Sequence, residues 1–350
     1  MILLTLRDLR FRAVRFVVVT LLGAVVFSLL FVMTGLVEQF HREPFDTVGG
    51  FGASTWVIAE GVTGPFTASS TMPADSVDAV DAATAATVAP VVTSRSSIAV
   101  GDHAEQVILV GHNPEALGTP RTVDGRSAQG PGEVVVDETI GAAVGETVKV
   151  GGVPFTVVGH SSDTTVLAGV PLVFMVLPEA QDLVFRSRDV ISGVLVDGDV
   201  GAVPPGTKAV EADAVAKDLL APLDGAIASV DLVRALLWIV AAVIIGAVVY
   251  LSALERQRDF AVLKAIGVSN RTLLASLALQ AVLVALASVG LAVVVQMFLA
   301  PAFPLKVTVP ARAFWQLPVL AVVMALVAGA VGMRRVARSD PALAFAGAGA

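Results

Sequence analysis

Cysteine is absent from the 350 residues, tyrosine occurs once and histidine four times. The lack of cysteine excludes disulfides, thiol catalysis and cysteine-based zinc sites. Charged residues make up only 15% of the chain, below the roughly 25% of soluble domains. Hydrophobic residues reach 55%, which excludes a disordered chain. The net charge of −7 does not favour nucleic acid as a partner, because nucleic-acid binding uses a basic surface.

The hydrophobic residues are concentrated in four stretches without a charged residue. These stretches are residues 16–37, 235–254, 272–305 and 313–333. A helix that spans a membrane needs about 20 apolar residues, and a charge at its centre costs roughly 2.5–3.5 kcal/mol. The pattern therefore predicts four transmembrane helices. The first stretch exceeds the 7–15 or so apolar residues of a signal peptide, so we expect it to remain as an anchor.

Basic residues gather at one side of the predicted spans. Segments 1–15, 255–271 and 334–350 together hold 11 basic and 4 acidic residues, whereas residues 38–234 hold 10 basic and 26 acidic residues. Cytoplasmic loops carry an excess of Lys and Arg. We therefore expect a multi-pass protein of the plasma membrane with both termini and the 255–271 loop in the cytoplasm. Residues 38–234 and 301–312 would then lie outside.

Short apolar runs alternate with turn residues in the long external segment. The runs predict strands over 88–93, 98–100, 107–110, 134–136, 147–150, 155–159 and 194–196. Gly151-Gly152 predicts a hairpin between two of these strands. Helices are expected over 75–86, 179–185 and 211–220, and a long helix over 225–254 after Pro222. These elements predict a folded, mixed α+β domain.

Together, these patterns predict the fold class and the division of the chain. We expect an α-helical membrane protein with four transmembrane helices and an extracytoplasmic mixed α+β domain. The expected segments are a cytoplasmic amphipathic start (1–15), the first span (16–37), the external domain and stalk (38–234), the second span (235–254), a cytoplasmic loop (255–271), the third span (272–300), a short external loop (301–312), the fourth span (313–333) and a cytoplasmic basic tail (334–350).

Motifs for catalysis are missing. The sequence has no G-x-S-x-G elbow and no H-E-x-x-H zinc helix, and its histidines have no partner at metal-ligand spacing. Residues 201–208 have the glycine spacing of a phosphate loop but end in Thr207-Lys208, where nucleotide binding needs Lys followed by Ser or Thr. We expect a chain that is not an enzyme and has no catalytic residue, metal or cofactor.

The predicted spans contain no Asp, Glu, Lys, Arg or His, and the third carries Gln280 and Gln296. Ion and proton relays through membranes generally use charged residues or histidine. Their absence argues against a secondary transporter or an ion pump. The glutamines are expected to bond across helices, at roughly 1 kcal/mol each.

The cytoplasmic loop carries a second pattern. Phe260, Leu263 and Ile266 recur every three residues behind a charged start, and Gly267 is a plausible helix stop. One interpretation is a solvated turn that follows the positive-inside rule. The other is a short helix that docks on a cytoplasmic partner through apolar anchors with a charged rim. The periodicity alone favours neither.

The loop resembles a motif of the MacB/FtsX-type ABC transporter permeases, E-R-x-R-E-[IF]-x-x-L-K-A-[IL]-G-[AV]-[ST], over residues 255–269, with Asp259 where Glu is commoner. The tail from Arg334 is similar to the family's basic tail ending in D-P-A-E-A-L, although Leu343 replaces the acid. Residues 6–15 resemble the family's amphipathic helix at the inner membrane surface, and residues 132–159 resemble its external domain. The order of one helix, a large external domain and three helices is also the family's.

The resemblance implies a mechanism and partners. In the family this loop is a coupling helix that seats in a groove of the ATP-binding subunit. The partner-binding residues implied here are Glu255, Arg256, Arg258, Asp259, Phe260, Leu263, Lys264, Ile266 and Gly267. Two permease chains, identical or different, would assemble in the lipid membrane with two ATP-binding subunits, which would hold ATP and Mg²⁺. ATP binding would move the external domain for efflux, for extraction of a lipid or lipoprotein, or for mechanotransmission to a periplasmic or cell-wall partner.

Two other functions remain open from the sequence. The chain could be the permease of an importer for a small solute such as an amino acid, which would need a polar path through the spans. It could also be a membrane-anchored external sensor without ATP coupling, which would have no need for a docking loop. The loop 255–269 favours the ATP-coupled permease over the sensor.

Overall fold

The structure is a computed structural model that describes residues 13–255, 262, 266, 268–303, 305 and 307–337. The chain divides into two compact units. We call Phe40–Ile227 the sheet unit, and Met1–Gln39 together with Ala228–Ala350 the helical unit. Two long helices, α2 (Ala13–Gly50) and α6 (Asp224–Glu255), contribute residues to both units.

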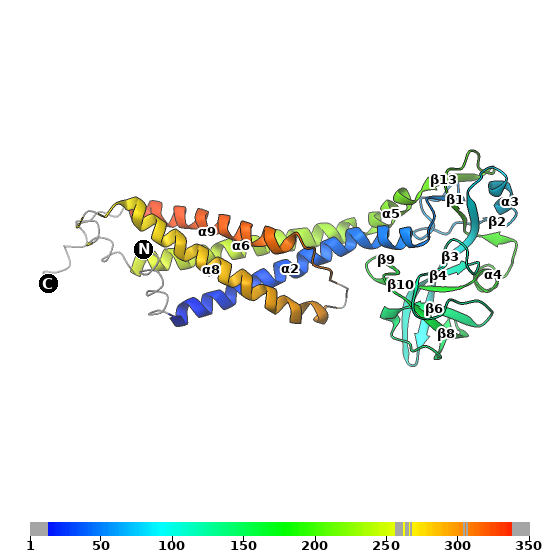
Figure 1. The fold of residues 1–350 in the computed structure, drawn as a ribbon, viewed down its shortest axis with the longest axis horizontal. Helices are drawn as coiled ribbons and strands as arrows, with labels where there is room; N and C mark the ends of the chain where they lie inside the picture. Colours follow the sequence, from blue (N-terminus) through cyan, green and yellow to red (C-terminus); the bar gives the residue numbers. More distant parts are fainter. Residues whose placement is uncertain are drawn as a thin grey trace. The chain divides into compact units, whose positions relative to one another are not determined.

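The helical unit contains most of α2 and α6, together with α8 (Asn270–Leu299) and α9 (Ala313–Ala337) (Figure 1). Within the described residues, three helical segments are long and apolar enough to cross a membrane: Phe16–Gly50, Ala212–Ser252 and Ala275–Leu299. The sequence predicted four. The fourth predicted span falls in α9, where the described apolar segment is the shorter Ala313–Val327.

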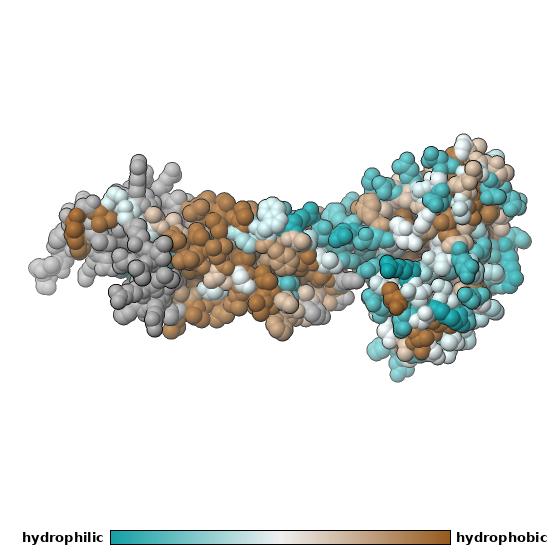
Figure 2. Space-filling view, in the orientation of Figure 1, coloured by the Kyte–Doolittle hydropathy of each residue, from teal (hydrophilic) through white to brown (hydrophobic). Residues whose placement is uncertain are grey.

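Apolar side chains from all four helices form one buried cluster in the helical unit. It includes Phe27 and Phe31 of α2, Ile245 of α6, Ala285 of α8 and Ala321 of α9. Small residues allow close approach: a Cβ at Gly23 would lie 2.6 Å from the Ser288 hydroxyl oxygen of α8. Figure 2 shows hydrophobic residues over most of the visible, non-grey surface of these helices, which suits a lipid environment.

The sheet unit is a mixed α+β domain, as the sequence predicted. Its main sheet has 11 strands, with the order β13-β1-β12-β3-β4-β10-β6-β8-β5 along its path. Beside this path β7 pairs with β3 and β8, and β9 pairs with β10, while β2 and β11 form a separate pair. The strands are β1 (Thr55–Ala59), β2 (Met72–Pro73), β3 (Thr87–Val100), β4 (His103–His112), β5 (Thr122–Gly125), β6 (Glu133–Asp137), β7 (Thr147–Val150), β8 (Val153–Ser161), β9 (Thr165–Val166), β10 (Val170–Val176), β11 (Val190–Ile191), β12 (Gly193–Asp197) and β13 (Thr207–Glu211).

Strand β3 joins the two halves of this sheet. Its first part pairs with β12 up to Val91, and its second part pairs with β4 from Val92 onward. Because side chains alternate along a strand, Val91 enters one core cluster and Val92 enters another. The first cluster contains Phe51, Trp56 and other aromatic residues, and the second is mainly aliphatic.

Several predicted elements are confirmed and others are corrected. The hairpin pairs Val150 with Val153 across Gly151-Gly152. The strands predicted at 88–93 and 98–100 are one strand, because the polar residues between them pair continuously with β4. The helix predicted over 75–86 is shorter, α3 (Ser76–Asp81), since the chain enters β3 at Thr87. The sequence did not predict β1, β2, β5, β9, β10, β11 or β13. Strand β10 is buried from Pro171 to Val176, so it has no polar alternation.

Short helices complete the sheet unit. They are α4 (Leu177–Val184) and α5 (Ala212–Leu220), with the 3₁₀ turns η1 (Glu138–Ile140) after β6 and η2 (Ala221–Leu223) before α6.

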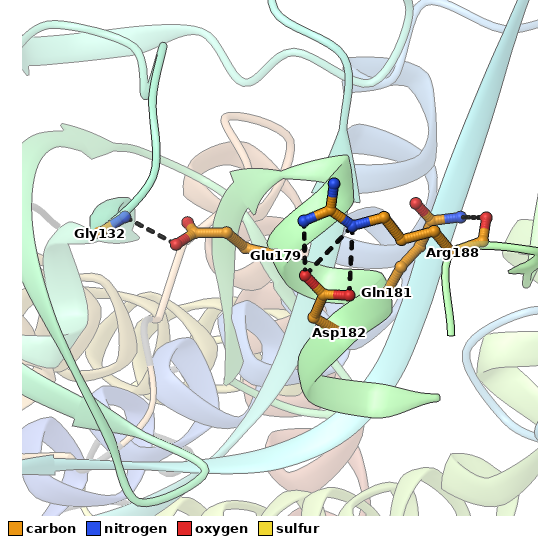
Figure 3. A network of polar contacts seen from close by, with 5 residues as sticks. All are labelled: Gly132, Glu179, Gln181, Asp182 and Arg188. Atoms are coloured by element: carbon orange, nitrogen blue, oxygen red, sulfur yellow. Dashed lines mark hydrogen bonds and ion pairs between the residues drawn. The ribbon is translucent and has the colours of Figure 1, made fainter. Parts of the chain in front are cut away.

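Polar contacts hold α4 to its neighbours (Figure 3). Glu179 accepts a hydrogen bond from the Gly132 N–H at 2.7 Å, and the Gln181 side-chain amide donates to the Arg188 carbonyl at 2.8 Å. Arg188 also pairs with Asp182 at 2.8 Å, and its hydrogen bond lowers the pKa of that carboxyl.

Candidate functional site

The predicted partner-binding loop follows directly from the end of α6. Glu255 is the last residue of α6 and is exposed. Ile266 lies in a turn with 75% of its surface exposed, and its N–H donates to the Val262 carbonyl at 3.1 Å. The other predicted contact residues lie outside the described residues: Arg256, Arg258, Asp259, Phe260, Leu263, Lys264 and Gly267.

Val262 is a further apolar residue at this site that the sequence reading left out. Its side chain is 56% exposed. The bond between Ile266 N–H and Val262 O spans one helical turn, so both side chains stand on one face. The four-residue spacing of these two residues was the signal that could have revealed the pair. Burial of an exposed apolar pair of this kind under a partner is favourable, because it removes apolar surface from water.

The structure also fixes where the loop ends. Ser269 is the N-cap of α8: its hydroxyl accepts a hydrogen bond from the Thr272 N–H at 3.3 Å and contacts the Thr272 hydroxyl at 2.9 Å. A serine cap satisfies a backbone donor that the first helical turn leaves free. Helix α8 therefore begins at Asn270, two residues before the predicted span.

A buried polar contact joins the two helices that flank the loop. The Gln280 amide of α8 donates to the Ser252 hydroxyl of α6 at 3.4 Å, and both side chains are buried. Ser252 lies one turn before Glu255. The bond across helices predicted for Gln280 is thus present, and it ties α6 to α8 near the loop.

At its other end, the helical unit holds α2 through the segment before α9. Arg312 forms an ion pair with Glu38, and the Thr308 hydroxyl donates to the Gln39 side-chain oxygen at 2.9 Å. A Cβ at Gly35 would lie 2.7 Å from the Val307 side chain, so the backbone of α2 approaches this segment closely. These contacts fix α2 where its residues pass from the helical unit into the sheet unit.

Within the sheet unit, the last turns of α2 hold the segment 163–169. Glu43 accepts from the Gly169 N–H at 3.0 Å, and the Thr47 hydroxyl donates to the Thr165 carbonyl at 2.5 Å. The segment has three non-glycine residues with positive φ, namely Asp163, Leu167 and Ala168. Such a backbone persists only where its surroundings hold it in place.

Asp137 holds the start of the same segment from the sheet. Its carboxylate is buried and accepts hydrogen bonds from the Thr164 N–H and hydroxyl, at 2.9 and 2.7 Å. The other carboxylate oxygen accepts from the Thr139 N–H at 3.0 Å. The segment therefore has bonds to α2 on one side and to β6 on the other.

Titratable groups elsewhere form no candidate metal site in the part of the chain that the structure describes. There, no three His, Cys, Asp or Glu side chains are close enough to hold a metal ion. His160 lies 3.5 Å from Asp124, and His112 is buried beside the Phe174 ring. Burial lowers the pKa of His112, which favours its neutral form.

The chain matches two protein families that together cover most of its length. Residues 17–215 match the MacB-like periplasmic core domain, and residues 232–341 match the FtsX-like permease C-terminal region. An uncharacterized ABC transporter permease of Mycobacterium tuberculosis is 42% identical over 349 residues, 99% of this chain and 100% of the relative. The chain belongs to the MacB/FtsX-type ABC transporter permeases. The resemblance drawn from the loop is thereby confirmed at the level of the family.

Other proteins are similar to this permease. A second uncharacterized ABC transporter permease of Mycobacterium tuberculosis is 38% identical over 348 residues, 99% of this chain and 100% of the relative. The periplasmic region of MacB from Actinobacillus actinomycetemcomitans is 15% identical, with a TM-score of 0.35, over 50% of this chain and 96% of that one. The membership of the family rests on the sequence matches.

Proposed function

We propose that this permease is the non-catalytic membrane subunit of an ABC transporter, in which a separate ATP-binding subunit moves the sheet unit through α2 and α6. One observation carries the proposal: the sheet unit is inserted between two helices that continue unbroken into the helical unit. At about 1.5 Å per residue, the 38-residue α2 is about 57 Å long, well beyond the roughly 30 Å of membrane hydrocarbon. When such a helix moves, the residues at both of its ends are displaced.

In this proposal the chain crosses the plasma membrane four times, with α9 as the fourth crossing. The 25 residues of α9 are sufficient for a span of about 20 residues. The basic residues of segments 1–15, 255–271 and 334–350 support a cytoplasmic position for both termini and the loop. The sheet unit then lies outside the cell membrane.

The loop after α6 is the proposed contact with the ATP-binding subunit. Its exposed apolar pair, Val262 and Ile266, supports this role, because burial of exposed apolar surface by a partner is favourable. The charged residues predicted around them would form the rim. ATP and Mg²⁺ would be held by that partner, and this chain would hold no cofactor.

The helical unit offers little for a solute to bind while it crosses. Its buried polar side chains, among the described residues, are uncharged: Ser28, Ser252, Gln280, Ser288 and Gln296. This favours work done on something outside, such as efflux, extraction of a lipid or lipoprotein, or mechanotransmission to a periplasmic or cell-wall partner. It argues against import of a small solute. Two permease chains, identical or different, would complete the complex.

The test is co-purification of an ATP-binding subunit with the permease from its native membranes, followed by measurement of ATP hydrolysis. The permease alone should hydrolyse no ATP, and the complex should. Ile266→Asp should weaken assembly more than tenfold, because an apolar anchor commonly contributes about 2 kcal/mol and a factor of ten is about 1.4 kcal/mol. Lys264→Ala, in the predicted rim, should have a smaller effect.

Val123→Asp provides the matched control, since Val123 is 55% exposed on the sheet unit, away from the loop in the sequence. It should leave assembly unchanged. A membrane-anchored sensor would yield no ATP-binding partner with any of the chains. Equal recovery of the partner with Ile266→Asp and wild type would show that the loop is a solvated turn.

A further inference from the structure

A small hollow opens in the sheet unit beside the end of the aromatic core cluster. Its volume is about 270 Å³, and the segment 65–69, β3 and β4 line it. Phe66 and Ile108 give it an apolar side, and Thr67, Ser69 and Thr93 give it hydroxyl groups. The charged residue of its lining is Arg95.

The alternation of side chains along β3 puts Arg95 on the face of the strand that is buried at the preceding positions. Val91, Thr93 and Arg95 follow one another on the same face of β3, and the first two are buried. Across the strand pair, Arg95 is in register with Ile108, which is 2% exposed. The arginine side chain itself remains exposed.

The guanidinium of Arg95 has no acidic partner among the described residues. Two other arginines of the sheet unit do: Arg126 pairs with Glu133, and Arg188 pairs with Asp182. Arginine presents N–H donors in a planar fork that matches the two oxygens of a carboxylate or phosphate. An unpaired fork at the edge of an apolar hollow has the chemistry to bind such a group.

The walls of the hollow are fixed before any ligand binds. The Thr93 hydroxyl donates to the Pro65 carbonyl at 2.7 Å, and the Thr67 hydroxyl donates to the Asp218 carboxylate of α5. Just beyond the lining, the Ser70 hydroxyl accepts from a backbone N–H of β1 at 3.2 Å. A preformed site loses less conformational freedom on binding than a mobile one.

We propose that this hollow binds a small organic anion, whose carboxylate or phosphate pairs with Arg95 and whose apolar part lies against Phe66 and Ile108. The volume is slightly below the 300–1,000 Å³ or so of drug-sized sites, so the ligand has the size of one ring or one amino acid. The surroundings oppose anions in general, because residues 38–234 hold 26 acidic and 10 basic residues. Selectivity therefore comes from the direct contact with Arg95.

The test uses the full chain in nanodiscs of zwitterionic phosphatidylcholine and saturation-transfer NMR of four probes. Benzoate and phenyl phosphate carry the two anionic groups, benzyl alcohol is a neutral analogue and benzylamine is a cationic one. Saturable binding of benzoate, phenyl phosphate or both is expected, beyond the signal from empty nanodiscs. The anion that binds more tightly identifies the oxyanion. Binding of neither anion, or equal binding of benzyl alcohol, overturns the proposal.

Variants connect the binding to this hollow. Arg95→Gln should weaken anion binding at least tenfold, and Arg95→Lys, which keeps the charge without the fork, should retain part of it. Arg121→Gln, an exposed arginine outside the lining, should bind as wild type does. Unchanged affinity in Arg95→Gln would place the probes elsewhere and overturn the site. No ATP or ATP-binding subunit is needed, so the outcome is independent of the proposed transport function.

Discussion

The carboxylate of Glu43 accepts a hydrogen bond from the backbone N–H of Gly169 at 3.0 Å, although the two residues are 126 positions apart in the sequence. Glu43 is only 5% exposed. One helical turn later, the Thr47 hydroxyl bonds to the Thr165 carbonyl. Together these bonds attach the end of α2 to the segment between β8 and β10, two strands that both pair with β6. Displacement of α2 would therefore act on the sheet through this segment.

Glu43→Ala should destabilise the protein. It removes the buried carboxylate that accepts from the Gly169 N–H, and a hydrogen bond to a charged group contributes about 1.5–3 kcal/mol. Glu43→Gln keeps an oxygen in place and should lose less. Asp46→Ala, an exposed change on the same helix, should stay within about 0.5 kcal/mol of wild type. Thermal unfolding followed by tryptophan fluorescence compares the four chains. Equal midpoints for Glu43→Ala and Asp46→Ala would show that the contact contributes nothing.

Gly111→Ala should disturb the packing of α4 on β4. A Cβ at Gly111 would lie 2.2 Å from the Ala180 Cβ and 3.3 Å from the Val92 Cβ, so helix or strand must shift. Overpacking of this kind costs about 1–3 kcal/mol. Gly130→Ala is the control, because no atom lies within 4 Å of its added Cβ.

A second change can restore the space that Gly111→Ala removes. Ala180→Gly takes away the contacting methyl group, although glycine in a helix costs about 1 kcal/mol by itself. The double variant should therefore be more stable than the sum of the two single effects predicts, in the unfolding assay used for Glu43. Strict additivity would mean that the two positions do not collide.

His112 should make stability depend on pH. Burial lowers the pKa of this histidine below its ordinary 6.5, so the unfolded chain takes up a proton at a higher pH than the folded chain does. Stability from this group is complete above about pH 6.5 and is lost as the pH falls toward the lowered value. Unfolding midpoints measured from about pH 8 to about pH 5 should fall less steeply for His112→Gln than for wild type. His103→Gln, an exposed change, should follow the wild-type curve, and an unchanged slope for His112→Gln would contradict the prediction.

Single cysteines should report the orientation in the membrane. The chain has no cysteine of its own, so each introduced thiol is the sole target. Ser97→Cys, on an exposed position of β3, should react with a membrane-impermeant thiol reagent in intact cells. Ser269→Cys, exposed at the start of α8, should react only after the membrane is opened. Labelling of Ser269→Cys but not Ser97→Cys in intact cells would reverse the topology.

Features encoded in contiguous residues could be predicted from the sequence. The helix over 225–254, the glycine hairpin and six of the 13 strands, namely β3, β4, β6, β7, β8 and β12, follow from local periodicity and turn residues, and they are present. The family followed from a nearly continuous motif between residues 255 and 269. The composition predicted four long apolar helices, whereas the described residues contain three, because the described apolar segment of α9 is shorter.

Features that depend on distant contacts could not be predicted. The polar residues Ser94 to Ser97 form strand because β4 supplies hydrogen-bond partners, and their own β propensity does not require it. Strand β10 lacks alternation because both of its faces are covered. The exposure of Val262 beside Ile266 could not be predicted from the residue types alone, because it depends on the local backbone that the Ile266–Val262 hydrogen bond reports.

The sequence by itself determined a family of membrane permeases, an apolar set of helices and an α+β domain, because charge-free runs, alternation and a contiguous motif are local properties of the chain. Only the tertiary structure decided that Glu43 bonds to Gly169 and that Arg95 borders a hollow without an acidic partner among the described residues. The first contact joins residues 126 positions apart, and the second depends on the register of β3 with β4 and on a segment near residue 66. Such pairings are selected by the packing of the whole domain, so no window of the sequence contains them.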